Sequence, residues 1–222
     1  MDRYITRVGS TLGDAIEDYN CDIGGATSGI DYEKQYNSLV NGITEITANQ
    51  FNGDLDIILG VYPNVTTIGE KAFQFCSNLE EANFPVATTI GNYSFNTSGI
   101  KSAYFPNLKT ISSGSFSNCP NLEIAYFHSA TSVISGAFAS SMNLKALVLG
   151  NDKVCYADSM MPMISIVNGA IMNGEGYIYV PRSIVDSYKS TAPWSGVANQ
   201  FRALEDYTVD GTTTGMLDES KI

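Results

Sequence analysis

The stretch TTIGEKAFQFCSNLEEANFP, Thr66–Pro85, is followed almost at once by TTIGNYSFNTSGIKSAYFP, Thr88–Pro106. The two stretches carry isoleucine, phenylalanine and proline at matching places, and the step from Ile68 to Ile90 is 22 residues. A chain that repeats itself at such a spacing builds the same structural unit several times, so neighbouring units are expected to stack.

The repetition extends over five copies, and four apolar positions of the copies stay in phase. The first two series advance by 22, 22, 21 and 22 residues. The four series are Ile46, Ile68, Ile90, Ile111 and Val133; Phe51, Phe73, Phe95, Phe116 and Phe138; Leu79, Ile100, Leu122 and Leu144; and Phe84, Phe105, Phe127 and Leu149. A period of about 20–29 residues with recurring apolar positions predicts a leucine-rich-repeat solenoid. We therefore expect about five turns of 21–22 residues, each with a short parallel strand.

Each copy contains a short segment in which apolar and polar residues alternate. In LEEANF, Leu79, Ala82 and Phe84 are predicted to point into the core. Pro85 and Pro106 cannot donate a ladder hydrogen bond, so the predicted strands end there. Stacked turns, about 4.8 Å apart along the ladder, would then bury one continuous core.

The pattern IG-x-x-AF-x-x-C-x-x-L resembles the BspA-like leucine-rich repeats. It reads IGEKAFQFCSNL at Ile68–Leu79 and GSFSNCPNL at Gly114–Leu122, and the resemblance covers about residues 43–150. The copies at Asn96–Gly99 and Ser140–Asn143 depart from it, because they lack the cysteine. The resemblance implies a solenoid of the kind that bacteria and phages encode, often on surfaces.

The two ends of the solenoid need covers. We predict an N-terminal arm and helical cap over residues 1–42, the solenoid over 43–150, an α/β capping module over 151–206, and a tail over 207–222 that is either flexible or docks on a partner. Ser183 and Asp186 indicate a capping box at the start of a helix in the C-terminal module. Trp194 is expected to cover the last turn rather than to bind a ligand.

The helical prediction at the N-terminus rests on two apolar series. The first is Leu12, Ala15, Ile16 and Tyr19, at the spacing of one helix face, and the second is Tyr32, Tyr36, Leu39, Val40 and Ile43. The pattern GSTLGDAIEDY…YNSLVNGIT resembles a helical module that precedes such repeats in phage structural proteins. This resemblance is the reason to consider a virion.

The composition excludes several classes of partner. The 222 residues carry a formal net charge of −11, and the sequence pI is about 4.4. An acidic chain repels the phosphates of nucleic acids and of anionic membranes. There is no stretch of roughly 20 apolar residues, which membrane insertion would require, and no signal-peptide pattern at the N-terminus. We therefore expect a protein that is made and kept in the cytosol, or that leaves it by a route other than a signal peptide. For a virion protein, which the phage resemblance implies, this would be the cytoplasm of the host.

The sequence offers little material for catalysis or metal binding. His128 is the single histidine, and it stands where Pro85 and Pro106 stand in earlier copies, so we expect a turn residue at a strand end. Asp54 and Asp56 fit a turn better than a calcium loop. We therefore predict no enzymatic activity, no cofactor and no metal site.

The cysteines are predicted to be buried free thiols. Cys76 and Cys119 occupy the same position two turns apart, about 10 Å by the ladder spacing. A disulfide requires Cα atoms within about 7 Å.

The residues between the core positions of each strand should point outward, and they drift from polar to apolar along the ladder. We take as candidate partner-binding residues Asn83, Tyr104, Ile124, Tyr126 and Val148. The alternative is that the cap or a second copy of the chain covers this strip.

The sequence favours two non-enzymatic functions over a third, enzymatic one. The first is a non-enzymatic phage structural or adhesion protein that is displayed on a capsid or tail. Its partners would be other virion proteins or a protein or glycan on the host surface, and several copies of the chain could associate as a homo-oligomer. The second is a bacterial cell-surface adhesin or host-interaction module. The third, a glycan-acting hydrolase, needs two carboxylates across a cleft, and Glu81 is the one carboxylate predicted on the outer face of the strands.

Overall fold

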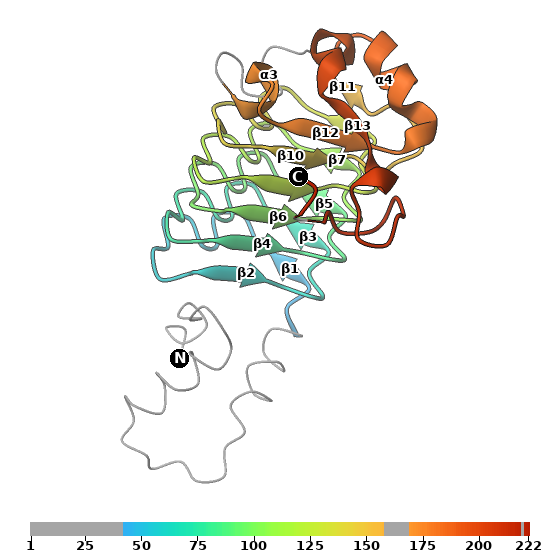
Figure 1. Ribbon diagram of the computed structural model, residues 1–222. Helices are drawn as coiled ribbons and strands as arrows, with labels where there is room; N and C mark the ends of the chain where they lie inside the picture. The colour runs from blue at the N-terminus through green and yellow to red at the C-terminus, as the bar shows by residue number, and fades with distance from the viewer. Residues whose placement is uncertain (1–41, 158–168, 219) are drawn as a thin grey trace, which may run out of the picture.

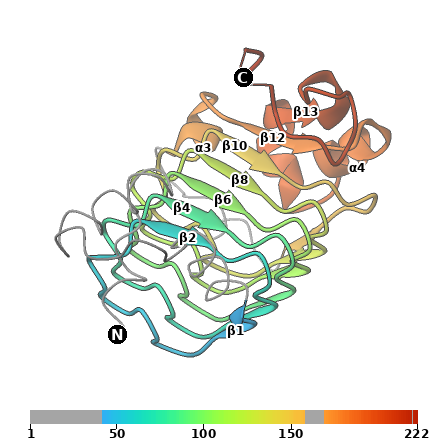
Figure 2. The same ribbon diagram turned by 90° about the horizontal axis from the view of Figure 1, so that it is seen from below.

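The computed structural model describes residues 42–157, 169–218 and 220–222, and Figure 1 shows their arrangement. The predicted N-terminal helices, and Cys21 with them, lie outside the described residues. The repeats form a regular stack of turns, with one strand of each turn on either side of the core (Figures 1 and 2).

One side of the stack is a seven-stranded parallel sheet in the order β13-β12-β10-β8-β6-β4-β2. Its strands are β2 (Leu59–Val61), β4 (Glu81–Asn83), β6 (Ser102–Tyr104), β8 (Ile124–Tyr126), β10 (Ala146–Val148), β12 (Tyr177–Val180) and β13 (Phe201–Ala203). Each repeat contributes one strand, and β12 and β13 of the C-terminal module extend the same sheet. The predicted short parallel strands are confirmed.

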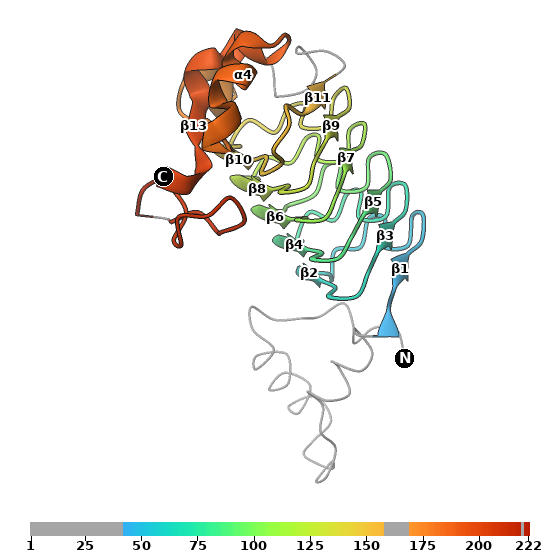
Figure 3. The same ribbon diagram turned by 90° about the vertical axis from the view of Figure 1, so that its right-hand side faces the viewer.

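The other side of the stack consists of two-residue strands in two three-stranded sheets. They are β1 (Glu45–Ile46), β3 (Thr67–Ile68), β5 (Thr89–Ile90), β7 (Thr110–Ile111), β9 (Ser132–Val133) and β11 (Tyr156–Ala157). The last residue of each strand is buried. In the first five strands it is the isoleucine or valine that the repeat pattern predicts, and in β11 it is Ala157, which pairs with Val133. Figure 3 shows this side well separated from the seven-stranded sheet.

The strand register confirms the period that the sequence predicts. Ala82 pairs with Ala103, and Ala103 pairs with Ala125, so each turn places the same repeat position beside its counterpart. Repeats of 21 and of 22 residues therefore have the same strand pairing, and the one-residue difference in their length lies in the loops.

Two columns of aromatic rings fill the space between the two sides. The phenylalanine series from Phe51 to Phe138 stacks nearly face to face, with ring centroids 4.9–5.6 Å apart. A second column runs from Tyr62 to Phe127 at 5.2–5.9 Å. Rings of the two columns meet edge to face, which is a favourable arrangement for aromatic pairs. This packing explains why the phenylalanines recur in phase.

The described cysteines, Cys76, Cys119 and Cys155, are buried and free, as predicted, and two of them also link neighbouring turns. The thiol of Cys76 lies 2.9 Å from the carbonyl oxygen of Phe51, and the thiol of Cys119 lies 3.0 Å from that of Phe95. Ser141 replaces the cysteine in the next matching copy and donates to the carbonyl of Phe116. Burial raises the pKa of Cys76 to about 12 and that of Cys119 to about 11, so both thiols stay protonated.

The C-terminal module covers the last turn with strands and short helices. These are α3 (Ala170–Asn173), η1 (Arg182–Ile184), α4 (Val185–Ser190), η2 (Trp194–Gln200) and η3 (Leu204–Asp206), of which the η elements are 3-10 helices. Trp194 is fully buried and donates to the carbonyl of Cys155, while the Tyr188 hydroxyl accepts from the Cys155 amide. The indole therefore joins the module to the last turn, as predicted.

The predicted capping box at Ser183 is wrong. Ser183 lies inside η1, and the residue before α4 is Ile184, which makes no side-chain cap bond. The amide of Arg182 instead donates to the carboxylate of Glu205, 2.9 Å away. A tertiary contact thus sets the chain direction here, and the local capping pattern does not.

Two positions in each repeat adopt the left-handed backbone conformation. One series is Asn49, Lys71, Tyr93, Gly114 and Gly136, and the other is Gly53, Phe75, Thr97, Asn118 and Ser140, with φ between 53° and 74°. Glycine tolerates this region best, asparagine visits it, and bulky residues are strained there. Phe75 adopts φ of 63° although half of its side chain is exposed, so it contributes strain with little packing in return.

We expect Phe75→Asn to increase the free energy of unfolding by about 0.5–1 kcal/mol, because asparagine relieves part of the left-handed strain. Asn118 already occupies the matching position two turns later. Equilibrium urea denaturation measures the change. Phe75→Ala is the control, since it removes the ring but keeps a strained Cβ. Equal effects of the two substitutions would contradict the argument.

Candidate functional site

The outward side chains of the seven-stranded sheet form two rows, which we call the outer face. The first row is Leu59, Glu81, Ser102, Ile124, Ala146 and Tyr177, and the second is Val61, Asn83, Tyr104, Tyr126, Val148 and Tyr179. All five residues predicted to bind a partner lie in these rows. The structure thus brings them onto one surface, but it does not leave that surface uniformly open.

The C-terminal module and the chain's own tail together cover the half of the outer face nearest that module. Val148 is 0% exposed and Tyr126 is 4% exposed, and both belong to a second apolar cluster completed by Leu204 and Leu217. Tyr104 and Ile124 pack against this cluster while keeping part of their surface accessible. The expectation that Val148 is available to a partner is therefore wrong in this structure, and the alternative of an internal cover applies here.

The described part of the tail is a short hairpin. Thr208 and Leu217 form an antiparallel bridge, and the amide of Val209 donates to the carbonyl of Met216. Figure 3 shows the hairpin on the outer side of the seven-stranded sheet. The sequence left the tail as either a flexible end or a docking arm, and its described residues instead pack on the chain's own sheet.

The hairpin touches the sheet through polar as well as apolar contacts. The amide of Leu217 donates to the hydroxyl oxygen of Tyr126 at 3.3 Å. Gly150 makes a close approach possible, because a Cβ there would lie 2.8 Å from the carbonyl oxygen of Thr213 and 2.9 Å from the ring of His128. The glycine at this strand end therefore allows the hairpin to pass.

His128 lies under the hairpin and not at an open turn. The residue is 8% exposed, and its ring stacks on Tyr126 at 6.0 Å and meets Tyr104 edge to face at 6.4 Å. Within the described residues, neither ring nitrogen meets the distance and angle of a hydrogen bond, although the backbone of Gly215 lies close enough to favour the protonated ring. Burial lowers the pKa of His128, and the backbone of Gly215 offsets this only in part. The sequence placed His128 correctly at a strand end but gave no sign of its burial, because the covering residues lie about 90 positions away.

A groove remains beside the hairpin, on the uncovered half of the outer face. Its volume is about 270 Å³, and it is lined by Glu81, Asn83, Ser102, Ala103, Tyr104, Tyr126 and Met216. Three of the predicted residues, Asn83, Tyr104 and Tyr126, thus line one depression, whereas Ile124 and Val148 do not. Sequence reasoning missed Met216, because nothing in the repeat indicates where the tail lies.

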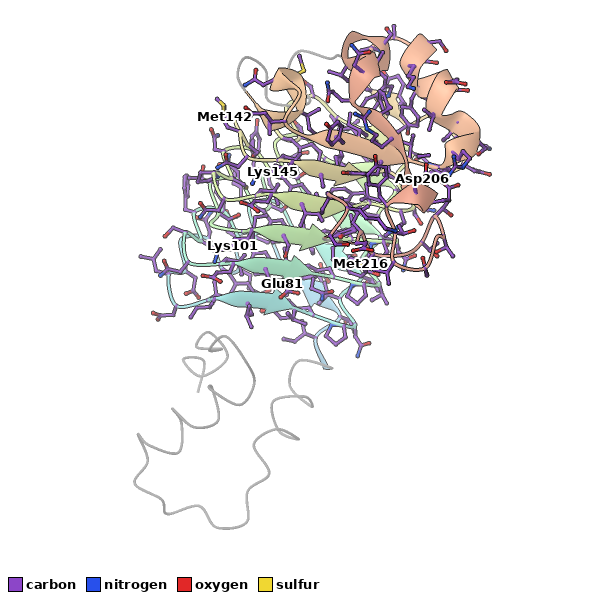
Figure 4. All side chains as sticks on the ribbon, in the orientation of Figure 1. Glu81, Lys101, Met142, Lys145, Asp206 and Met216 are labelled. Carbon is purple, nitrogen blue, oxygen red and sulfur yellow. The ribbon has the colours of Figure 1, made fainter. Side chains whose placement is uncertain are left out.

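Polar groups at one wall of the groove are arranged around Glu81. The side-chain amide of Asn83 donates to the Glu81 carboxylate at 3.1 Å. The neighbouring Glu80 pairs instead with Lys101 at 3.0 Å, outside the groove. Figure 4 shows Glu81 and Met216 on the same side of the molecule, with Lys101 at the strand entry. The groove therefore combines one carboxylate, neutral hydrogen-bonding groups and two aromatic rings.

The described part of the chain contains no group of three or more histidine, cysteine or acidic side chains that could hold a metal ion. Asp54 and Asp56 form a turn, in which the Asp54 carboxylate accepts from the Asp56 amide at 2.9 Å. Within the same residues, no helix is both long and apolar enough to span a bilayer.

Lowering the pH from 8 to 5 should loosen the hairpin. The ordinary pKa of His128 is 6.5 and the folded value is lower, so below pH 6.5 the open state binds a proton that the closed state excludes. Stability of the closed state is therefore lost as the pH falls through this window. Asp210 and Asp218 have pKa values lowered from 3.8 and stay ionised throughout it.

Hydrogen exchange of the Leu217 amide, corrected for the intrinsic pH dependence, measures this opening. We expect its protection to drop several-fold between pH 8 and 5 in the wild type. His128→Phe keeps the ring stack without a titrating group and should show a flat profile. The same drop in both proteins would remove His128 as the cause.

The repeats match a known protein family. The model of the BspA type leucine-rich repeat region matches residues 38–157 in six copies. A search of curated proteins finds no match. A solved leucine-rich repeat protein from Bacteroides ovatus is 19% identical, with a TM-score of 0.37; the alignment covers 62% of this chain and 43% of that one. With more than half of its residues matched by the family model, the chain belongs to the BspA-type leucine-rich-repeat family.

Proposed function

We propose that this protein is a non-enzymatic interaction module that binds another protein through the uncovered half of its outer face, formed by β2, β4 and β6. Leucine-rich-repeat domains generally mediate protein–protein interactions. One observation carries the proposal: the C-terminal residues of the chain cover only one half of the outer face. The other half stays open, and the groove lies at the edge between the two.

The composition of the uncovered half supports a protein partner. Leu59, Val61 and Tyr104 offer apolar and aromatic contact surface, and all three are half-buried and held by a hydrogen-bonded sheet. Glu81 and Asn83 supply polar groups beside them. An aromatic anchor on a rigid element with polar neighbours is the usual make-up of a protein-binding surface.

A photo-crosslinking amino acid at position 83 tests the proposal in the cells or particles from which the protein comes. We expect one dominant protein adduct from this position and none from position 92. Asn92 is the matched control, because it is exposed on the other side of the solenoid, just after β5. Tyr104→Ala should weaken binding of the identified partner at least about tenfold. The absence of an adduct at position 83, or identical adducts at both positions, would contradict the proposal.

We further propose that the protein is displayed on a phage virion as a capsid or tail component, with synthesis in the host cytoplasm. The support is the similarity of GSTLGDAIEDY…YNSLVNGIT to helical modules of phage structural proteins, a stretch largely outside the described residues. A bacterial cell-surface adhesin is the alternative, and either role allows a glycan ligand.

Density-gradient purification of the source particles tests the virion role. The protein should co-sediment with assembled particles in a constant ratio to the major capsid or tail protein. Recovery in a free cytosolic fraction alone would contradict the virion role, and recovery with the bacterial envelope would support the adhesin.

A further inference from the structure

The groove on the outer face has a size that suits one side chain. Its volume is about 270 Å³, below the roughly 300–1,000 Å³ of sites that enclose small molecules. Met216 of the lining comes from the tail hairpin, and Ser102, Ala103 and Tyr104 come from β6. A single long side chain of a partner could enter, whereas an oligosaccharide would extend beyond the walls.

The charge of the groove is negative and uncompensated within the described residues. The ion pairs found among all described residues join Glu70 to Lys71, Glu80 to Lys101, Glu123 to Lys145, Asp206 to Arg182 and Asp218 to Lys221. Glu81 takes part in none of them, and the polar contact found for its carboxylate is the neutral amide of Asn83. The whole chain carries a net charge of −11, so the wider field also attracts a cation.

The same outer face already holds a guanidinium group on a tyrosine. Arg202 of β13 lies over the ring of Tyr177 of β12, 4.0 Å from its centroid. Tyr177 and Tyr104 both point outward from the sheet, in its two different rows. Cation–π contact on an outward tyrosine is therefore compatible with the geometry of this sheet.

We propose that the groove binds an arginine side chain of the protein partner, with the guanidinium against the Glu81 carboxylate and over the Tyr104 ring, and the aliphatic stem along Met216. This inference rests on the proposed function and names the chemistry of the partner. Arginine fits better than lysine, because its planar group can pair with a carboxylate and stack on a ring at the same time.

The test uses the full chain and the capped peptide acetyl-Gly-Arg-Gly-amide, followed by NMR of labelled tyrosine rings. The peptide should shift the Tyr104 resonances saturably, with a dissociation constant on the order of 1–10 mM. The citrulline peptide has nearly the same shape without the charge and should bind at least about tenfold more weakly. Equal binding of the two peptides, or a tighter saturable shift with maltotriose, would overturn the inference.

Two substitutions with the same charge change separate the groove from the overall field. Glu81→Gln should weaken the arginine peptide at least about tenfold. Glu45→Gln, on the exposed opposite side in β1, should change it less than twofold. Thermal melts of both variants show whether the fold is kept. Equal effects of the two substitutions would overturn the inference.

The crosslinking experiment distinguishes this inference from the function on which it rests. If Glu81→Gln forms the position-83 adduct as readily as the wild type, the arginine site is excluded and the interaction module stands. If the arginine peptide binds in a Glu81-dependent manner but no adduct forms at position 83, the groove accepts a cation and the proposed module fails.

Discussion

The parallel register between successive turns is the constraint on which the rest of the structure depends. Ala82, Ala103 and Ala125 occupy neighbouring rungs, so each side chain of one turn meets the same repeat position of the next. A residue suited to stacking on itself is therefore favoured at every core position, and the phenylalanine columns are the result. Polar groups repeat in the same way, because Cys76, Cys119 and Ser141 each donate a hydrogen bond to a phenylalanine carbonyl of the preceding turn.

The register also determines the composition of the outer face. Because each turn contributes its outward residues to the same two rows, a change from polar to apolar along the repeats creates a continuous strip, from Asn83 through Tyr104 and Tyr126 to Val148. The apolar end of this strip is buried by Leu204 and Leu217, and the polar end stays open. The C-terminal module and the tail thus divide one surface into a covered half and an available half.

Two features lie where these halves meet. The ring of His128 is enclosed between the sheet and the hairpin, and within the described residues its nitrogens make no hydrogen bond of regular geometry, which makes the contact sensitive to protonation. The groove at the same boundary takes one wall, Met216, from the hairpin, and Tyr104 and Tyr126 contact both sites. Movement of the hairpin would therefore alter the groove, so its position is linked to any ligand that the groove binds.

The sequence by itself determined the solenoid, its period, the inward residues and the free thiols of Cys76 and Cys119, because each follows from local periodicity and a known ladder spacing. It also placed Asn83, Tyr104 and Tyr126 on one surface, since alternation along a strand decides which side chains point outward. The start of α4, the burial of Val148 and His128, and the wall formed by Met216 were decided by tertiary structure alone. Each depends on contacts between segments far apart in the chain, such as Arg182 with Glu205 and Tyr126 with Leu217, for which a repeat pattern contains no signal.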